Sequence, residues 1–223
     1  MCGRFSQKTN LKKFAAKLNI TGSRIPELIP RYNIAPSQEV AVIIQEKGAQ
    51  PAIELLKWGL VPSWAKDPAI GNSMINARAE TLAIKPSFRG PLRKQRCLIP
   101  ADGFYEWKKE GRSKTPYYIH LKSGQPFAFA GLWSHWRGPD GRELRSFTII
   151  TTGPNDLIRS IHDRMPVILS EDAEKYWLDP AQDNSKDILS ALSPYPAGEL
   201  EAYPVSTLVN SPANDRPECI APV

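Results

Sequence analysis

Apolar residues recur along the chain in short runs that are separated by prolines and glycines. The 21 prolines are about twice the usual share, and they lie between the runs instead of gathering in one linker. Runs rich in β-branched and aromatic residues predict strands at 40–45, 53–58, 97–99, 104–107, 117–121, 127–133, 147–151 and 167–169. This spacing predicts a mostly antiparallel, partly closed β-sheet or barrel.

A helical period is present at fewer places. One face of the segment 9–19 is apolar and consists of Leu11, Phe14, Ala15 and Leu18. Thr9 or Asn10 can cap this helix, and its lysines point outward. Further helices are expected at 77–84, 155–160 and 171–177, the last with Ser170 as its N-cap. We therefore expect an α+β fold in which short helices flank the β core, formed by a single domain over residues 1–223.

The composition and the net charge of the chain restrict the classes of protein to which it can belong. With 41% hydrophobic and 23% charged residues, the 223-residue chain can bury one substantial core. Its net charge of +6 favours a polyanionic partner, although many other soluble proteins carry a similar charge. The three cysteines are an odd number without metal-site spacing, which argues against a disulfide framework and a zinc site. No signal peptide or apolar stretch of ~18 residues occurs, so we expect a cytoplasmic protein without membrane spans.

The first residues of the chain can provide an unusual reactive group, a 1,2-aminothiol. The small residues Cys2 and Gly3 after Met1 favour methionine removal, which leaves an amine and a thiol on one residue. The amine titrates near ~8 and the thiol near ~8.5, and such a 1,2-aminothiol traps an aldehyde as a Schiff base that closes to a thiazolidine. Arg4 would lower the pKa of the thiol and suit an anionic substrate. A cysteine at position 2 is also compatible with chance, with an N-terminal-nucleophile amidotransferase or with capture of a sugar aldehyde.

Two loops have an unusual content of rigid and aromatic residues. The segment 31–36 ends at Pro36, which can present a rigid apolar edge but can equally be part of a turn. The segment 58–64 places Trp58 and Trp64 around a loop with glycine and proline. Such tryptophans belong either to the core or to a surface that stacks on or wedges between bases.

A third segment, 75–81, places an amide and a guanidinium at the start of the expected helix. Asn76 can serve as the helix N-cap. Alternatively, Arg78 can hold a phosphate at the helix start while Asn76 orients a reacting group.

Candidate proton-transfer groups lie in the segments 104–107 and 161–166. Glu106 lies between Tyr105 and Trp107 in an expected strand, so that desolvation would raise its pKa toward general acid-base use. A structural salt bridge is the alternative. His162 precedes Asp163 and Arg164, which could tune its charge or bind phosphate, although a single histidine can also be structural.

Together these segments resemble one known family. Residues 1–5, 31–36, 58–64, 75–81, 101–107 and 161–166 match, in this order, the motifs of the SRAP (SOS-response-associated peptidase) proteins, which shield abasic sites in single-stranded DNA by covalent crosslinking. Residues 214–218 also resemble the family. Cys219 departs from the aliphatic residue expected there, which we expect to affect packing only.

The resemblance implies a role for each candidate catalytic residue. Cys2 would attack C1′ of the ring-opened abasic deoxyribose, and Asn76 would position the amine or the ring product. Glu106 would shuttle protons during Schiff-base formation and ring closure. His162 would assist proton transfer to the sugar oxygen. No metal or other cofactor is required.

The resemblance also implies a DNA-binding set, which consists of Arg4, Asn33, Pro36, Trp64, Arg78, Thr151 and Arg164. The arginines would hold phosphates around the lesion, Thr151 would contact DNA, and Trp64 with Pro36 would keep a flanking duplex open. The implied partner is single-stranded DNA with an abasic site, including junctions with duplex. We expect a monomer of bacterial or phage origin that acts in the SOS response.

Other functions remain open from the sequence alone. A noncovalent reader of single-stranded or modified DNA would use the same surface and survive the loss of Cys2. An autoproteolytic cysteine peptidase that exposes Cys2, or an N-terminal-nucleophile amide hydrolase, would share the nucleophile. A Cys2→Ala variant separates the covalent from the noncovalent functions.

Overall fold

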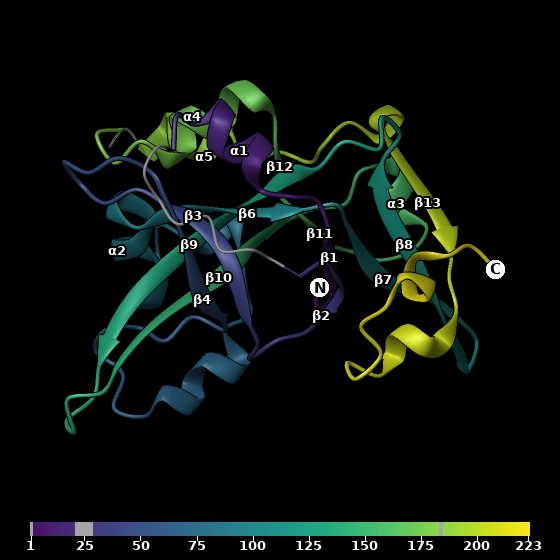
Figure 1. The fold of residues 1–223 in the computed structure, drawn as a ribbon, viewed down its shortest axis with the longest axis horizontal. Helices are drawn as coiled ribbons and strands as arrows, with labels where there is room; N and C mark the ends of the chain where they lie inside the picture. Colours follow the sequence, from purple (N-terminus) through teal and green to yellow (C-terminus); the bar gives the residue numbers. More distant parts are fainter. Residues whose placement is uncertain (1, 21–28, 183–184) are drawn as a thin grey trace.

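A closed ring of strands forms one side of the protein, on the left in Figure 1. The computed structural model describes residues 2–20, 29–182 and 185–223. The ring contains β3 (Glu39–Ile44), β4 (Ala52–Trp58), β6 (Arg96–Ala101), β9 (Phe127–Arg137) and β10 (Glu143–Thr152). Antiparallel pairing runs in the order β4, β3, β6, β9, β10, and a parallel contact between β10 and β4 closes the barrel. The predicted fold class is confirmed, and the barrel closes completely.

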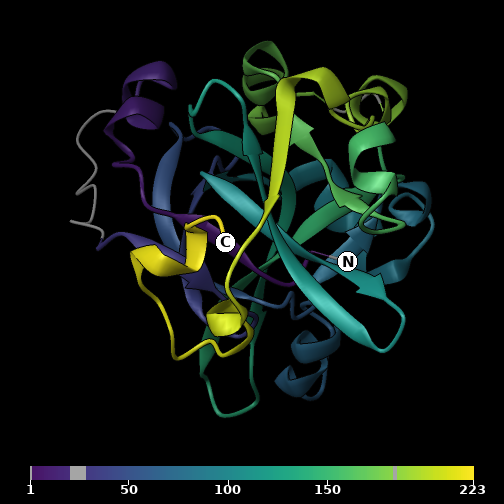
Figure 2. The ribbon, with the colours of Figure 1, turned by 90° about the vertical axis from the view of Figure 1, so that its right-hand side faces the viewer.

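A second, antiparallel sheet lies beside the barrel. Its strands are β13 (Leu200–Pro204), β8 (Ser113–Leu121), β7 (Gly103–Glu110), β1 (Phe5–Gln7) and β2 (Arg31–Ile34), in this order. Figure 2 shows β13 and the β7–β8 hairpin crossing in front of the barrel. Because β1 pairs with β7 on one side and β2 on the other, the start of the chain is held in the interior of this sheet.

The expected helix at 77–84 is wrong. Its first part forms β5 (Asn76–Arg78), which runs parallel to β10, and η2 (Ala79–Thr81) is a short 3-10 helix. Pairing with β10 brings the side chain of Ala77 into the core, where it is 1% exposed. Long-range pairing thus overrides the local helical preference. Two short strands, β11 (Met165–Pro166) and β12 (Ile168–Leu169), extend the ring at β10 and β9.

The other expected helices are confirmed as α1 (Lys12–Lys17), α3 (Asp156–Arg159) and α4 (Glu171–Leu178). Asn155 and Ser170 cap α3 and α4 with their side-chain oxygens. Further helical elements, which the sequence analysis did not predict, are α2 (Pro86–Lys94), α5 (Ser185–Ser190), η1 (Pro68–Ser73), η3 (Ala197–Glu199), η4 (Thr207–Asn210) and η5 (Pro217–Ile220). None of the helices within the described ranges has the length and apolar character that crossing a membrane requires.

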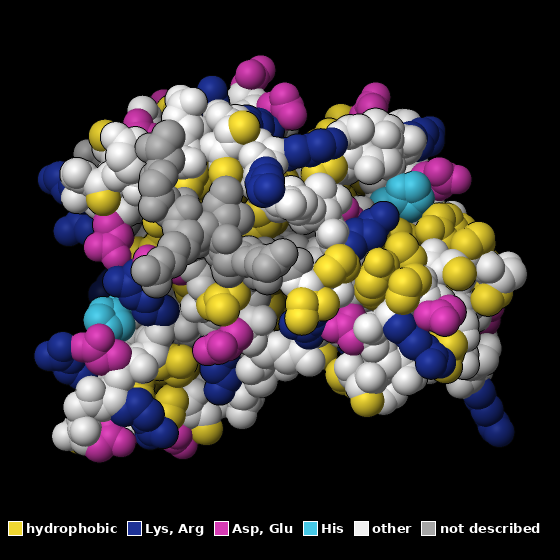
Figure 3. Space-filling model, in the orientation of Figure 1, with side chains coloured by type: hydrophobic (Ala, Val, Ile, Leu, Met, Phe, Trp, Pro, Cys, Tyr) yellow, Lys and Arg dark blue, Asp and Glu magenta, His cyan; other side chains and the backbone are white. Residues whose placement is uncertain are grey.

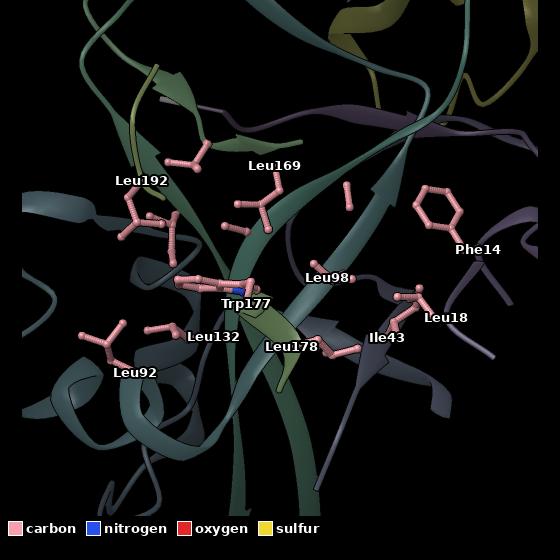
Figure 4. Packing of buried hydrophobic residues seen from close by; sticks show 14 of the residues in the cluster. Phe14, Leu18, Ile43, Leu92, Leu98, Leu132, Leu169, Trp177, Leu178 and Leu192 are labelled. Atoms are coloured by element: carbon pink, nitrogen blue, oxygen red, sulfur yellow. The ribbon is translucent and has the colours of Figure 1, made fainter. Parts of the chain in front are cut away.

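Two hydrophobic clusters hold these layers together. In the first, Trp177 of α4 packs between leucines of the barrel and of the outer helices (Figure 4), and its indole N–H donates to the carbonyl of Cys97 at 3.0 Å. In the second, the ring of Phe5 meets the rings of Trp58 and Phe129 edge-on, with centroids 5.2 and 5.8 Å apart. This second cluster packs β1, a strand of the second sheet, against the barrel, and it also contains Cys2.

Candidate active site

The packing of Phe5 determines where the candidate nucleophile lies. Cys2 is fully buried, and its Sγ lies 3.9 Å from the carbonyl oxygen of Arg4. Burial, and in second place the charge of Glu106, raises the pKa of the Cys2 thiol above its ordinary value. The expectation that Arg4 lowers this pKa is wrong, because desolvation dominates and the guanidinium of Arg4 points elsewhere. Met1 lies outside the described residues.

Glu106 comes from the middle of β7, where it pairs in register with Tyr117 of β8. The residue is 2% exposed, and burial raises its pKa to about 7. The aromatic neighbours of Glu106 predict this direction. A carboxyl group with a pKa of about 7 is protonated in about half of the molecules at neutral pH, so it can both donate and accept a proton.

His162 follows α3 and meets Glu106. Its Nε2 lies 3.8 Å from Oε2 of Glu106, while its Nδ1 accepts the backbone N–H of Arg164 at 3.1 Å. Asp163 Oδ1 lies 2.9 Å from the same Nδ1 and would instead favour a proton there. Burial lowers the pKa of His162, so the neutral ring with its proton on Nε2 agrees best with these contacts. Glu106 and His162 therefore form a pair that can move protons.

Asn76 presents an acceptor instead of capping a helix. It pairs in register with Ile149 on the edge of β10, and its Nδ2 donates to the carbonyl of Ile75 at 3.0 Å. Trp58 Nε1 donates to the same carbonyl at 2.9 Å. The Oδ1 of Asn76 is buried and accepts no hydrogen bond from the residues that the structure describes. This oxygen can receive an N–H or O–H of a ligand.

The guanidinium of Arg164 donates hydrogen bonds to two residues, Thr151 and Glu80. Its Nη2 donates to the carbonyl of Thr151 at 2.6 Å, and its guanidinium pairs with both carboxylate oxygens of Glu80 at 2.6 and 3.0 Å. Thr151 is fully buried and its carbonyl positions Arg164, while the expected DNA contact of Thr151 stays a prediction. Arg78, which pairs in register with Thr151, is exposed beside them.

Asn33 has a similar positioning role. It is fully buried, and its Nδ2 donates to the carbonyls of Val209, Ser211 and Asn214 at 3.2, 3.0 and 2.6 Å. Its Oδ1 accepts a hydrogen bond from Arg4 Nη1 at 2.7 Å. Both polar atoms of this amide are engaged within the protein, and the expected DNA contact of Asn33 stays a prediction.

The loop that contains Trp64 is exposed, and a close backbone contact between two glycines holds it in place. Trp58 is fully buried in the core, whereas Trp64 is 58% exposed. Gly59 has a φ of +127°, and a Cβ atom there would lie 2.6 Å from the carbonyl oxygen of Gly71. This close backbone contact holds both ends of the loop. Pro36 is half-buried on the segment that precedes β3.

Comparison with known proteins shows the family of this chain. The model of the SOS response associated peptidase (SRAP) family matches residues 1–212. The chain belongs to the SRAP family. It is 51% identical over 223 residues to the abasic site processing protein YoqW of Bacillus subtilis, covering 99% of each chain, and 33% identical over 228 residues to the abasic site processing protein YedK of Escherichia coli, covering 100% of each. A solved protein from Bacteroides thetaiotaomicron is similar over 100% of both chains, with a TM-score of 0.89 and 30% identity.

Within residues 2–20, 29–182 and 185–223, no three His, Cys, Asp or Glu side chains are grouped so that they could hold a metal ion.

Two acidic residues at the SRAP site escaped the sequence analysis. Glu80 pairs with Arg164, and its position within the segment 75–81 was the available signal. Asp215 accepts the backbone N–H groups of Tyr32 and Asn33 at 2.5 and 3.0 Å and forms an ion pair with Arg31. The segment 214–218, which resembles the family, contains Asp215, but its contacts could not be predicted locally, because its partners lie more than 180 residues earlier in the chain.

Proposed function

We propose that this protein processes abasic sites in DNA by capturing the deoxyribose aldehyde with Cys2 after removal of Met1. The observation that carries the proposal is the buried carboxyl of Glu106, with a pKa of about 7, whose charge acts on the Cys2 thiol and which lies 3.8 Å from His162. The names of YoqW and YedK, which match nearly the whole chain, support the same substrate.

The chemistry follows from these groups in two steps. The free amine of Cys2 attacks C1′ of the aldehyde, and the resulting carbinolamine loses water to give an imine. Protonated Glu106 donates the proton that the departing oxygen needs. The Cys2 sulfur then adds to the imine carbon, and its proton moves through the Glu106 carboxylate to the imine nitrogen, which yields a thiazolidine. The product has the mass of protein plus DNA minus one water.

The remaining polar groups support these steps. Because burial holds the thiol protonated, closure depends on a base next to it, and Glu106 fills this role. His162 Nε2–H donates to the sugar ring oxygen when the ring opens. The Oδ1 of Asn76 accepts an N–H of the reacting amine. Held in place together, such groups contribute several kcal/mol through orientation.

Recognition of the lesion has to use its surroundings, because the abasic aldehyde is small and neutral. Exposed Arg78 binds a neighbouring phosphate, and Arg164 does so when Glu80 gives way. Trp64 stacks on a base beside the lesion or at a junction with duplex, with Pro36 as a rigid edge. The partner in this proposal is single-stranded DNA, bound by a monomer in the bacterial cytoplasm during the SOS response.

A general peptidase is a weaker proposal. The buried, protonated thiol of Cys2 is a poor nucleophile toward a peptide bond. Peptidase activity in this protein would therefore be limited to the exposure of Cys2 by removal of its own Met1.

The test is the intact mass of the Met1-processed protein after incubation with a single-stranded oligonucleotide that carries one abasic site. We expect an adduct of protein plus DNA minus water that survives denaturation and is missing in Cys2→Ala. Cys219→Ala is the matched control, since it removes another buried thiol that has no free amine. Absence of the adduct with fully processed protein refutes aldehyde capture.

A further inference from the structure

The outward face of α2 is strongly basic. Arg89 and Arg93 lie one helical turn apart on this face, Lys94 ends the helix, and Lys85 is the residue just before it. All four are exposed, and the helix contains no acidic residue. None of them forms an ion pair or a side-chain hydrogen bond with any residue of the described ranges. Many basic side chains on the face in Figure 3, in contrast, lie beside acidic ones.

A groove adjoins this helix. It has a volume of about 520 Å³ and lies between α2 and the turn that joins β3 and β4. Lys47 of the turn faces Arg93 and Lys94 across the groove. Glu46 also lines it, but its carboxylate is held by Arg145 at 3.0 Å. We call Lys47, Lys85, Arg89, Arg93 and Lys94 the α2 basic surface.

Helix stability does not explain this surface. Cations in the last turn are favourable because of the helix dipole, which accounts for Arg93 and Lys94. Lys85 and Arg89 lie at the start of the helix and gain nothing from the dipole. On the inner face, Phe88 and Leu92 are buried in the core, so the helix is firmly docked and presents its charges at fixed positions. Exposed cations on a helix without acidic residues, none of them in an ion pair with a described residue, are typical of a surface that binds a polyanion.

We propose that the α2 basic surface binds the phosphate backbone of the DNA strand that carries the lesion, beyond the nucleotides at the candidate active site. This proposal rests on the proposed function for the identity of the polyanion. In the sequence, α2 begins eight residues after Arg78. The surface contacts phosphates and is therefore independent of base sequence.

The test compares two triple variants of the full-length protein with equal loss of charge. The first is Arg89→Gln, Arg93→Gln, Lys94→Gln, in which glutamine keeps a similar helix propensity. The control is Lys8→Gln, Lys12→Gln, Lys122→Gln, three exposed lysines whose side chains have no partner in the described ranges. Fluorescence anisotropy measures noncovalent binding of undamaged single strands of about 5 and about 25 nucleotides over a range of salt concentrations.

For the long strand, we expect the α2 variant to reduce the slope of log affinity against log salt by about 2, since each lost phosphate contact contributes about 0.7. For the short strand, and for the crosslinking rate on a short abasic strand at saturation, we expect no change. The control variant keeps the wild-type slope. Equal losses in both variants, or an unchanged slope in the α2 variant, overturn the proposal.

Failure of the proposed function gives a different result. In one outcome, the wild-type protein forms no adduct, and only the α2 variant loses salt-dependent affinity for the long strand. This outcome supports DNA binding by the α2 basic surface and refutes aldehyde capture by Cys2. If the adduct forms and the affinity of the α2 variant matches the control, then only the α2 basic surface is refuted.

Discussion

Replacing Glu106 by glutamine is expected to stabilise the protein at alkaline pH while it removes the proposed chemistry. Glutamine has the shape of a protonated glutamic acid but carries no charge at any pH. The wild-type carboxyl group is 2% exposed, and burial penalises its charged form. At low pH the two side chains are therefore nearly equivalent, and at high pH only the wild type has to keep a charge in the interior.

The magnitude follows from the raised pKa. An ordinary glutamate titrates at 4.5, whereas Glu106 titrates at about 7 in the folded protein. Between these pH values the folded state holds a proton that the unfolded state has lost, so the free energy of unfolding falls as the pH rises through this window. The total loss is about 3 kcal/mol, and it is complete above about pH 8. The advantage of Glu106→Gln should grow from near zero at about pH 4.5 to at most this value.

Urea unfolding of both proteins between pH 4.5 and 8.5 measures this difference, with the same N-terminus in each. Other titrating groups cancel when the two curves are subtracted. Glu39→Gln, at an exposed position, is the matched control for the loss of a carboxylate. A difference that does not change with pH, or a glutamine variant that is less stable at pH 8, refutes the reasoning. On abasic DNA, the same variant should crosslink about 10²–10⁴-fold more slowly.

Three further variants test residues that hold the backbone or the side chains around the candidate site. Gly59→Ala places a Cβ atom 2.6 Å from the carbonyl oxygen of Gly71 at a φ of +127°, and urea unfolding should show a loss of roughly 2–4 kcal/mol. Asn33→Ala removes donors from three carbonyls and should lower the free energy of unfolding by about 2–4 kcal/mol, again measured in urea. Glu80→Gln removes the carboxylate from Arg164, so anisotropy at low salt should show DNA binding that is tighter by up to about 1 kcal/mol.

These three predictions have separate controls. Gly198→Ala introduces a methyl group where no atom lies within 4 Å, and a similar loss there would contradict the packing argument for the glycine loop. An Asn33→Asp variant that unfolds like the wild type would show that the amide donors do not matter. Unchanged or weaker DNA binding in Glu80→Gln would mean that Arg164 does not take a phosphate.

The barrel strands and β7, β8 and β12 were predictable, because their apolar and aromatic runs are buried along most of their length. The sequence analysis did not predict β1, β2, β5, β11 and β13, and the segment 31–36, which it described as a loop, contains β2. The segment 77–84 was mistaken for a helix, because its local composition cannot reveal the parallel pairing with β10. The prolines explain the missed α2: Pro86 stands in its first turn and Pro91 lies inside it, and both suggested loops. Proline is tolerated at the start of a helix, so a proline-rich segment is not always a loop.

The residues of the candidate site also differ in how far the sequence predicts their surroundings. The high pKa of Glu106 was predictable, because its aromatic neighbours adjoin it in the sequence. The burial of Asn33 and Thr151 was not, because it depends on residues that are distant along the chain. Residue type alone could therefore not predict that Asn33 and Thr151 hold the side chains of Arg4 and Arg164.

The anchoring of Arg4 has a consequence for how the protein is made. Arg4 Nη1 donates to the carbonyl of Val209, which lies 205 positions later, and Asn33 beside it needs Ser211 and Asn214 as well. A ribosome synthesises the chain from its first residue, so these contacts cannot form until nearly the whole chain has emerged. The contacts of Arg4 therefore form last, whereas β1 can pair with β2 and β7 as soon as these strands have emerged.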